Sequence, residues 1–224
     1  MTSPRPGAPA TDEPVVRKGE ATRQAVLEQA VETASRCGLA GLTIGSLATQ
    51  AGMSKSGLFA HFRSKEALQL RVLECARDAF ALGVVKPALG APRGEQRIKT
   101  LFESWLAVTT KGTSECLFVS ASWEFDDQPG VVRDQLVQYH RDFEDAVAQM
   151  VRVAVAEGHF RSDAGPEQFA FELHGLMLGY FLSHRLLGEV RAEAMARLAF
   201  GRLLAHAQRG VVGTPSLLRE SVNL

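Results

Sequence analysis

Most of the chain repeats apolar residues at intervals of three and four positions, the spacing that lines them along one face of an α-helix. The first such stretch starts at Thr22 and ends before Gly38, a residue type that often terminates a helix in the left-handed conformation. Its apolar positions are Val26, Leu27, Ala30, Val31 and Ala34. No alternating apolar and polar run exceeds four residues, so strands are not expected. The pattern predicts an all-α protein.

Three shorter helices are predicted directly after the first. Thr43, Ser54 and Ser64 each precede an apolar stretch and carry a side-chain oxygen that can cap a helix N-terminus. Gly52 ends the second helix after about two turns, and the fourth extends to about Phe80. Four helices are therefore expected within roughly sixty residues.

The pattern loosens over residues 86–94, where Pro and Gly residues predict a connector. Five further helices are expected over 95–109, 115–123, 131–157, 166–187 and 191–208. We therefore expect a disordered tail (1–16), a small N-terminal helical domain (17–65), a C-terminal helical bundle (66–210) and a C-terminal tail (211–224).

Composition and charge restrict the class of protein. The chain is 46% apolar and 22% charged with no formal net charge, as is usual for a soluble globular protein. Residues 17–65 differ from the whole, with seven Lys and Arg against three acids. No apolar stretch approaches the 18 residues of a membrane span, and residues 1–16 lack a signal-peptide pattern. With three dispersed cysteines that suggest no disulfide framework, we expect a cytoplasmic protein.

The segment from Ile44 to His61 has the pattern of a helix-turn-helix. Ala48, Gly52 and Leu58 supply the small contact residue, the flexible turn and the aliphatic residue that closes a miniature core. Residues 43–65 include no acid that would repel a phosphate backbone. This segment predicts DNA binding through the first turn of the third helix, although a solvated helical hairpin is the simpler alternative.

These residues resemble the N-terminal domain of the TetR family of transcriptional regulators. The resemblance rests on the stretches TRQAVLEQA (22–30), LT (42–43), LA (47–48), AGMSK (51–55), LF (58–59), HF (61–62) and SKEAL (64–68), and on Gly38. It implies an all-helical homodimer whose three N-terminal helices bind double-stranded operator DNA. It also implies a C-terminal bundle, residues 66–210 here, that holds a small molecule and the dimer interface.

The resemblance further implies which side chains contact DNA. Thr43 and Lys65 would hold phosphates at helix ends, and His61 would touch the DNA backbone. The residues expected against the major groove are Ser54, Lys55, Ser56 and Gly57. Phe59 stands where the family usually has Tyr and would pack against a sugar or a thymine methyl group, and Ala60 replaces a commonly bulkier residue.

Arg17 and Lys18 are expected to precede the first helix on a flexible segment. A basic arm of this kind can enter the adjacent minor groove, as basic arms of other DNA-binding proteins do. The alternative is that the two charges serve only solubility.

The predicted helix over 166–187 is apolar on two faces and so must be covered on both. With the small-residue helix that follows it, this helix predicts an interface between two copies of the chain, unless it is buried within a monomer. The candidate effector-binding residues are aromatic, histidine and methionine side chains of the C-terminal bundle. They are Trp105, Phe118, Trp123, Tyr139, Phe143, Met150, His174, Met177 and Phe181, any of which can instead belong to an ordinary core.

The sequence contains no compact metal-ligand motif, nucleophile motif or nucleotide-binding glycine loop, so we predict no metal, no cofactor and no catalysis. The leading hypothesis is a DNA-binding regulator, most often a repressor in this family, released from its operator by a small hydrophobic effector of unknown identity. One alternative is a DNA-binding regulator without an effector. The other is a helical carrier or enzyme.

Overall fold

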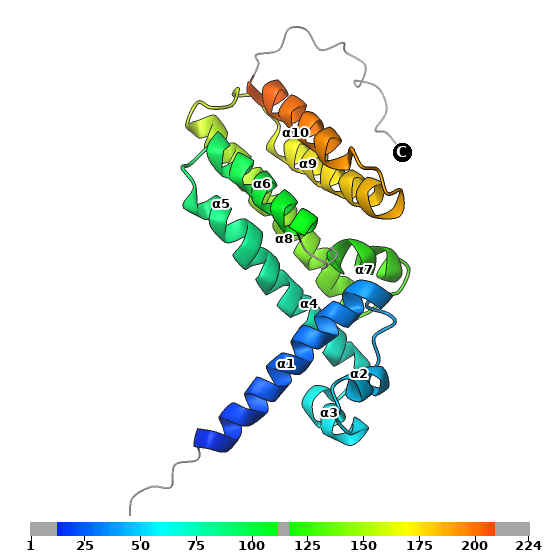
Figure 1. Cartoon of the computed structure of the whole chain (residues 1–224). Helices are drawn as coiled ribbons and strands as arrows, with labels where there is room; N and C mark the ends of the chain where they lie inside the picture. Colours follow the sequence, from blue (N-terminus) through cyan, green and yellow to red (C-terminus); the bar gives the residue numbers. More distant parts are fainter. Residues whose placement is uncertain (1–12, 112–116, 209–224) are drawn as a thin grey trace, which may run out of the picture. The chain divides into compact units, whose positions relative to one another are not determined.

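The computed structural model describes residues 13–111 and 117–208, and their side chains from 21 to 110 and from 117 to 208 (Figure 1). The described residues form helices and no strand, which confirms the all-α prediction. The α-helices are α1 (Glu13–Cys37), α2 (Ile44–Gln50), α3 (Lys55–Phe62), α4 (Lys65–Phe80), α5 (Lys86–Gly90), α6 (Glu95–Lys111), α7 (Leu117–Phe125), α8 (Val131–Ala156), α9 (Pro166–Phe181) and α10 (Ala192–Gln208). Two π-helical turns, η1 (Ala81–Val85) and η2 (Leu182–Leu186), follow α4 and α9.

Side-chain caps begin the three helices for which they were predicted. Thr43 Oγ1 accepts the backbone N–H of Ser46 at 3.0 Å, and Ser54 Oγ accepts that of Gly57 at 3.1 Å. Ser64 caps α4 in the same way through the N–H of Ala67, at 3.0 Å. Each cap satisfies one of the backbone donors that a helix leaves free in its first turn.

Two predicted boundaries are wrong. Residues 86–90 of the expected connector are helical as α5, because Pro87 lies in the first turn, where its missing N–H costs no helical hydrogen bond. α1 begins at Glu13, so the backbone at Arg17 and Lys18 is helical and not the expected flexible arm. The side chains of both residues lie outside the described part of the chain, as do residues 1–12 of the predicted N-terminal tail and the whole predicted C-terminal tail (211–224). Residues 13–16 of the predicted N-terminal tail are helical.

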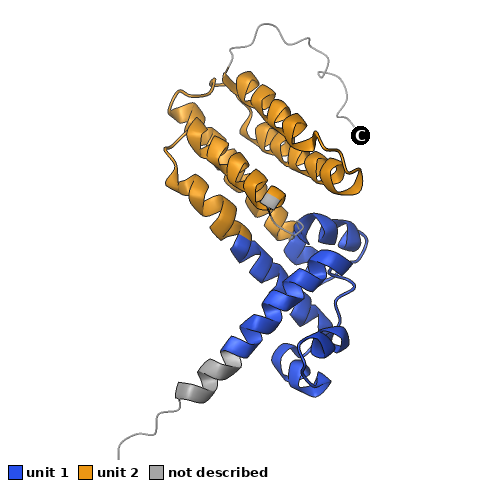
Figure 2. Cartoon of the chain, viewed as in Figure 1, with its two compact units in different colours: residues 1–79, 113–136 blue, residues 80–112, 137–224 orange. Residues whose placement is uncertain are grey.

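The chain divides into two compact units (Figure 2). Unit 1 comprises residues 1–79 and 113–136, and unit 2 comprises 80–112 and 137–224. Helix α7 therefore packs with the N-terminal helices, whereas the sequence pattern assigned it to a continuous C-terminal bundle. None of the described helices combines the length and apolarity that crossing a bilayer requires.

Each unit has its own apolar core. In unit 1, the fully buried side chains come from α1 and α4 as well as from the short helices and turns, and they include Leu27, Leu39 and Leu58. In unit 2, the core lies among the long helices, where Phe102 of α6 stacks on Phe200 of α10 with 4.0 Å between ring centroids. Helices α9 and α10 lie side by side in this unit (Figure 1).

Candidate nucleic-acid interface and effector lobe

Helices α2 and α3 form the predicted helix-turn-helix (Figure 1). Ala48 and Leu58 are buried between them, at 1% and 0% exposure. Gly52 has a φ of +63° in the turn, and the N–H of Met53 donates to the carbonyl of Ala48 at 2.9 Å. The small residue, the left-handed glycine and the aliphatic residue thus have the structural roles that their spacing predicted.

The first turn of α3 lies on the surface. Ser54, Lys55 and Ser56 are exposed, and Gly57 is half-buried. A Cβ atom on Gly45 of α2 would lie 3.3 Å from Cε of Lys55, so the lysine side chain lies across the start of α2. Sequence reasoning missed Gly45, whose lack of a side chain leaves room for Lys55. The surface therefore offers hydroxyl groups and one ammonium group, which suit base edges and phosphates.

The second half of α3 exposes an aromatic ring, and the helix ends in a strained turn. Phe59 is 54% exposed, and His61 is half-buried beside Phe62. Arg63 has a φ of +60°, and the N–H of Ser64 donates to the carbonyl of Phe62 at 2.6 Å across it. A left-handed backbone at a non-glycine residue costs about 1–3 kcal/mol and often marks a functional position. No sequence pattern indicated this strain at Arg63.

The two predicted phosphate contacts already have partners within the protein. Thr43 Oγ1 lies 2.8 Å from Ser46 Oγ in addition to capping α2. Lys65 Nζ donates to the carbonyl of Ala40 at 2.6 Å. An ammonium group has three N–H donors, so this bond leaves Lys65 donors that a phosphate can accept.

The turn between α1 and α2 is held from two other helices. Gln69 of α4 donates from Nε2 to the carbonyl of Leu39 at 2.9 Å. Glu124 of α7 accepts the backbone N–H groups of Leu39 and Ala40, at 3.2 and 2.6 Å. Glu124 is far from this turn in sequence, and no motif pointed to it.

The structure does not bring the nine candidate effector-binding residues together in one unit. Phe118 and Trp123 belong to unit 1, where Trp123 is 71% exposed, unlike the wall of an enclosed pocket. The other seven belong to unit 2 with different degrees of burial. Trp105 and Met150 lie in the core, Phe143 and Met177 pack against it, and Tyr139, His174 and Phe181 are half-buried.

His174 lies in a polar cluster between α8 and α9. Its Nδ1 is 2.7 Å from Oε1 of Glu144, and its ring stacks on that of His140 with 5.2 Å between centroids. The rings of Phe143 and His174 are arranged edge to face, with 5.7 Å between their centroids. In neutral His174, a proton on Nδ1 directed at the carboxylate leaves Nε2 as an acceptor for a donor group of a bound molecule.

Tyr180 forms a second polar position, on the α6-facing side of α9. Its side chain is 5% exposed. Its ring is edge to face with that of Trp105 and stacked on that of His184, with 5.2 and 5.3 Å between the ring centroids. Burial raises the pKa of Tyr180, with a smaller raising effect from Glu193 and an opposing one from nearby Thr109. The phenol therefore stays protonated at neutral pH, and its hydroxyl has no hydrogen-bond partner of normal geometry among the described residues.

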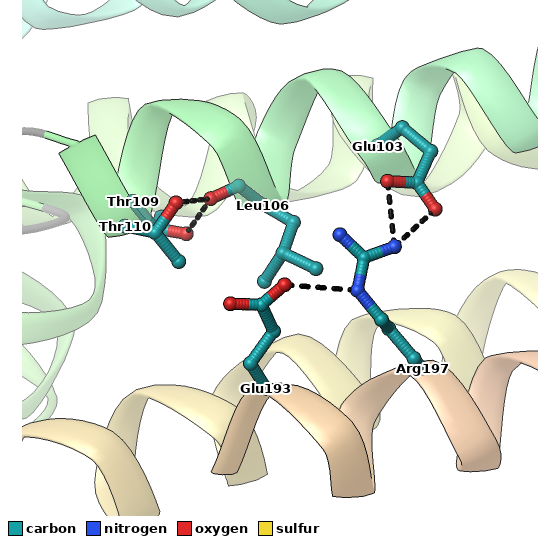
Figure 3. Close-up of polar contacts among 6 residues, drawn as sticks. All are labelled: Glu103, Leu106, Thr109, Thr110, Glu193 and Arg197. Carbon is teal, nitrogen blue, oxygen red and sulfur yellow. Dashed lines mark hydrogen bonds and ion pairs between the residues drawn. The ribbon is translucent and has the colours of Figure 1, made fainter. Parts of the chain in front are cut away.

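Arg197 of α10 ties that helix to α6 (Figure 3). Its Nη1 donates to both oxygens of Glu103 at 2.6 and 2.7 Å, and its Nε donates to Glu193 at 2.9 Å. Hydrogen bonds to Glu103 and then Glu193 raise the pKa of Arg197. The hydroxyls of Thr109 and Thr110 donate to the carbonyl of Leu106 at 3.0 and 2.8 Å, so their protons are used within α6.

No group of three or more His, Cys, Asp or Glu side chains in the described residues is arranged to hold a metal ion. Cys37 and Cys75 are free thiols, and burial raises the pKa of Cys75. The thiolate form, which is the reactive one, is therefore disfavoured at Cys75.

Comparison with known proteins identifies the family. The family model "Bacterial regulatory proteins, tetR family" matches residues 26–72, and "Tetracyclin repressor-like, C-terminal domain" matches residues 94–200. The HTH-type transcriptional regulator SrpR of Pseudomonas putida is 25% identical over 189 residues, which cover 84% of this chain and 86% of that protein.

Solved structures share the fold. A TetR transcriptional regulator from Chloroflexus aurantiacus J-10-FL superimposes with a TM-score of 0.73 at 23% identity, covering 85% of this chain and 96% of that one. AibR in complex with isovaleryl coenzyme A and operator DNA gives a TM-score of 0.68 at 21% identity, covering 82% and 98%. With two family models matched in order and the helix-turn-helix in place, the chain belongs to the TetR family and is a DNA-binding transcriptional regulator.

Proposed function

We propose that the chain is a homodimeric repressor that binds operator DNA through unit 1 and responds to a small effector in unit 2. The observation that carries the DNA-binding part is the capped first turn of α3. Ser54, Lys55 and Ser56 are exposed there, on a stretch without acids from residue 43 to 65. Thr43, Gly57, Phe59, His61 and Lys65 complete the proposed surface.

The test of the DNA contact is the salt dependence of binding to a duplex that the wild-type protein selects from a random library. Lys55→Ala is expected to weaken binding and to reduce the slope of log K against log salt concentration by about 0.9 for each phosphate that the variant no longer neutralises. Lys86→Ala is the matched control, because Lys86 is an exposed lysine of unit 2. Equal slopes for wild type and Lys55→Ala would remove Lys55 from the interface.

A homodimer is supported by an uncovered apolar face on α9, η2 and α10. One side of α9 is buried in the core through Phe169, Leu173 and Tyr180. The other side leaves Phe171 68% exposed, and the face continues along η2 and α10. Its remaining large apolar residues are Leu182, Leu186, Leu187, Met195 and Leu198, each at least half exposed. An apolar surface of this extent is typical of an interface.

Sedimentation tests the dimer. Phe171→Lys with Leu198→Lys is expected to give a monomer and to weaken operator binding, because two linked recognition helices bind a two-part site far more tightly than one. Leu82→Lys is the control, since Leu82 is 64% exposed on η1. A double variant that still sediments as a dimer would exclude this face as the interface.

We place effector binding in unit 2, at the polar positions of α9. His174 and Tyr180 each present a polar group among aromatic side chains. Such a lining suits a small, largely apolar molecule with one or two hydrogen-bonding groups. AibR is described in complex with both isovaleryl coenzyme A and operator DNA, so a protein of this fold accommodates both kinds of ligand.

A compound panel screened by thermal shift tests effector binding, because a ligand of the folded state raises the melting temperature. A true effector is expected to weaken operator binding roughly 5- to 150-fold, and operator DNA must weaken effector binding by the same factor. His174→Ala is expected to reduce the thermal shift. An effector that binds equally with and without operator would favour the regulator that has no small-molecule control.

A further inference from the structure

Helix α7 lies within the segment matched by the C-terminal family model, yet it packs in unit 1 with the DNA-binding helices. Its point of attachment is the short turn between α1 and α2, residues Gly38–Ala40. This turn closely precedes Thr43, the cap of α2. A contact that fixes the turn therefore also fixes where α2 begins.

The contact is a carboxylate holding two consecutive backbone amides. Glu124 Oε1 accepts the N–H of Leu39, and Oε2 accepts that of Ala40. Hydrogen bonds to an ionised group are about twice as strong as neutral ones. At Gly38, where φ is +84°, a Cβ atom would lie 2.5 Å from Oε1 of Glu124. Glycine is therefore needed there both for the backbone conformation and for the approach of the carboxylate.

The carbonyl groups of the same two residues are bonded from α4. Gln69, which is 3% exposed, donates to Leu39, and Lys65 donates to Ala40. Ala40 thus connects two charged side chains, since its N–H is held by Glu124 and its carbonyl accepts the ammonium group of Lys65. Lys65 is one of the proposed phosphate contacts, so the position of its ammonium group depends on the position of Ala40.

We propose that Glu124 is a positioning residue for operator binding. Its carboxylate fixes Ala40, and through Ala40 it places the Lys65 ammonium group for the DNA backbone. This inference rests on the proposed contact of Lys65 with a phosphate. It adds a residue from the C-terminal family segment to the machinery of the DNA-binding unit.

Substitution of Glu124 in the whole chain distinguishes the two effects. A positioning role and the removal of a negative charge predict opposite changes in the affinity for DNA. Glu124→Gln removes a negative charge, which alone would tighten binding to a polyanion. The proposal predicts the reverse, a roughly tenfold weaker affinity for the selected duplex, on the scale of one charge-assisted hydrogen bond. Glu124→Asp keeps the charge but is one methylene shorter, so it is expected to weaken binding as well.

The control for charge is Asp127→Asn, which removes one negative charge from the exposed loop after α7. It is expected to leave binding unchanged or slightly tighter. Titrations are made well below the melting temperature of each variant, so that loss of the fold does not imitate loss of affinity. Hydrogen exchange at the amides of Leu39 and Ala40 is expected to accelerate in Glu124→Gln and Glu124→Asp.

A double-mutant cycle with Lys65→Ala separates positioning from a general structural role. If Glu124 acts through Lys65, Glu124→Gln weakens binding much less in the Lys65→Ala background than in the wild type. The proposal is overturned if the two substitutions reduce the affinity independently, so that their fold-changes multiply in the double variant. It is also overturned if Glu124→Gln binds as tightly as the wild type. Failure of the wild-type protein to bind any duplex would instead refute the DNA-contact assignment, so the two failures are distinguishable.

Discussion

Units 1 and 2 are both helical, but their sequences specify them in different ways. In unit 1, helices α2 and α3 are short, and single residues determine where they begin and turn, such as Thr43 and Ser54 at caps and Gly52 in a left-handed turn. In unit 2, helices α6, α9 and α10 are long, and a broad apolar core holds them together. Short-range rules therefore define the helix-turn-helix of unit 1, whereas unit 2 depends on which long helices pack against each other.

Core substitutions should show the largest effect and sharpen this contrast. Leu58→Ala is expected to lower the free energy of unfolding of unit 1 by about 2–5 kcal/mol, because Leu58 is fully buried between two short helices that cannot collapse onto a cavity. Urea unfolding followed by circular dichroism measures the decrease. Leu173→Ala of α9, 1% exposed in the wild type, is the matched substitution in unit 2.

Leu173→Ala is expected to cost a similar free energy while leaving the affinity for operator DNA nearly unchanged under folding conditions. Leu58→Ala is expected to weaken it, because α3 loses its fixed position. A cost below about 1 kcal/mol for Leu58→Ala would show that the miniature core is not closely packed. Equal effects of both substitutions on operator affinity would remove the contrast between the units.

A glycine substitution tests the short-range rule itself. Gly52→Ala is expected to cost about 1–2 kcal/mol, since an L-residue is strained by this much in a left-handed backbone and no atom lies within 4 Å of the added Cβ. Gly52→Asn should cost less, because asparagine adopts this conformation more readily. Thermal unfolding of both variants measures the difference. Equal stability of wild type and Gly52→Ala would mean that the turn does not require glycine.

The same contrast explains how much of the fold and of the candidate site could be predicted from the sequence. The caps at Thr43, Ser54 and Ser64 and the turn at Gly52 follow from chemistry within a few residues, and the structure confirms them. The contact of Glu124 with Ala40 joins positions far apart in sequence, and no periodicity encodes such a contact. The DNA-binding roles of the surface residues remain predictions.

The candidate effector-binding residues differ in burial in a way that the sequence did not predict, for a related reason. Aromatic residues were chosen by type, but type does not determine depth, so Trp105 lies in the core at 4% exposure while Trp123 is 71% exposed. Tyr180 was not among the candidates, because its burial and the lack of a hydrogen-bond partner for its hydroxyl among the described residues depend on the packing of α6 against α9. In unit 2 the chemistry of a residue depends on its neighbours in space.

An ion-pair cycle tests whether polar contacts between the helices of unit 2 matter as much as its core. Arg197→Ala, Glu103→Ala and the double variant should give a coupling free energy of about 0.2–1 kcal/mol, because both side chains are about half exposed and water screens the pair. Chemical denaturation at low and high salt measures the cycle, and the coupling should fall in high salt. A coupling above about 2 kcal/mol would contradict a core-dominated unit 2.

The smallest expected effect concerns pH and the start of α6. Burial raises the pKa of Glu95, but hydrogen bonds from Lys99 and Gln208 and the charge of Lys99 outweigh it, so the pKa is lowered overall. A carboxyl group with a lowered folded-state pKa contributes stability above its unfolded-state pKa and loses it as the pH falls through its folded-state pKa. Glu95→Gln is therefore expected to lower the melting temperature by roughly 1 °C at about pH 7 and by less at about pH 3.

Calorimetry of Glu95→Gln and wild type at both pH values checks this expectation, with Glu172→Gln on α9 as the control for an exposed carboxylate. Because the carboxylate of Glu172 accepts a hydrogen bond from the neutral amide of Gln168, its substitution should shift the melting temperature by less than that of Glu95 at about pH 7. A difference between wild type and Glu95→Gln that grows on acidification would mean that the carboxyl group is stabilised in its protonated form. Stability at this end of unit 2 would then come from a buried neutral acid and not from the Lys99 ion pair.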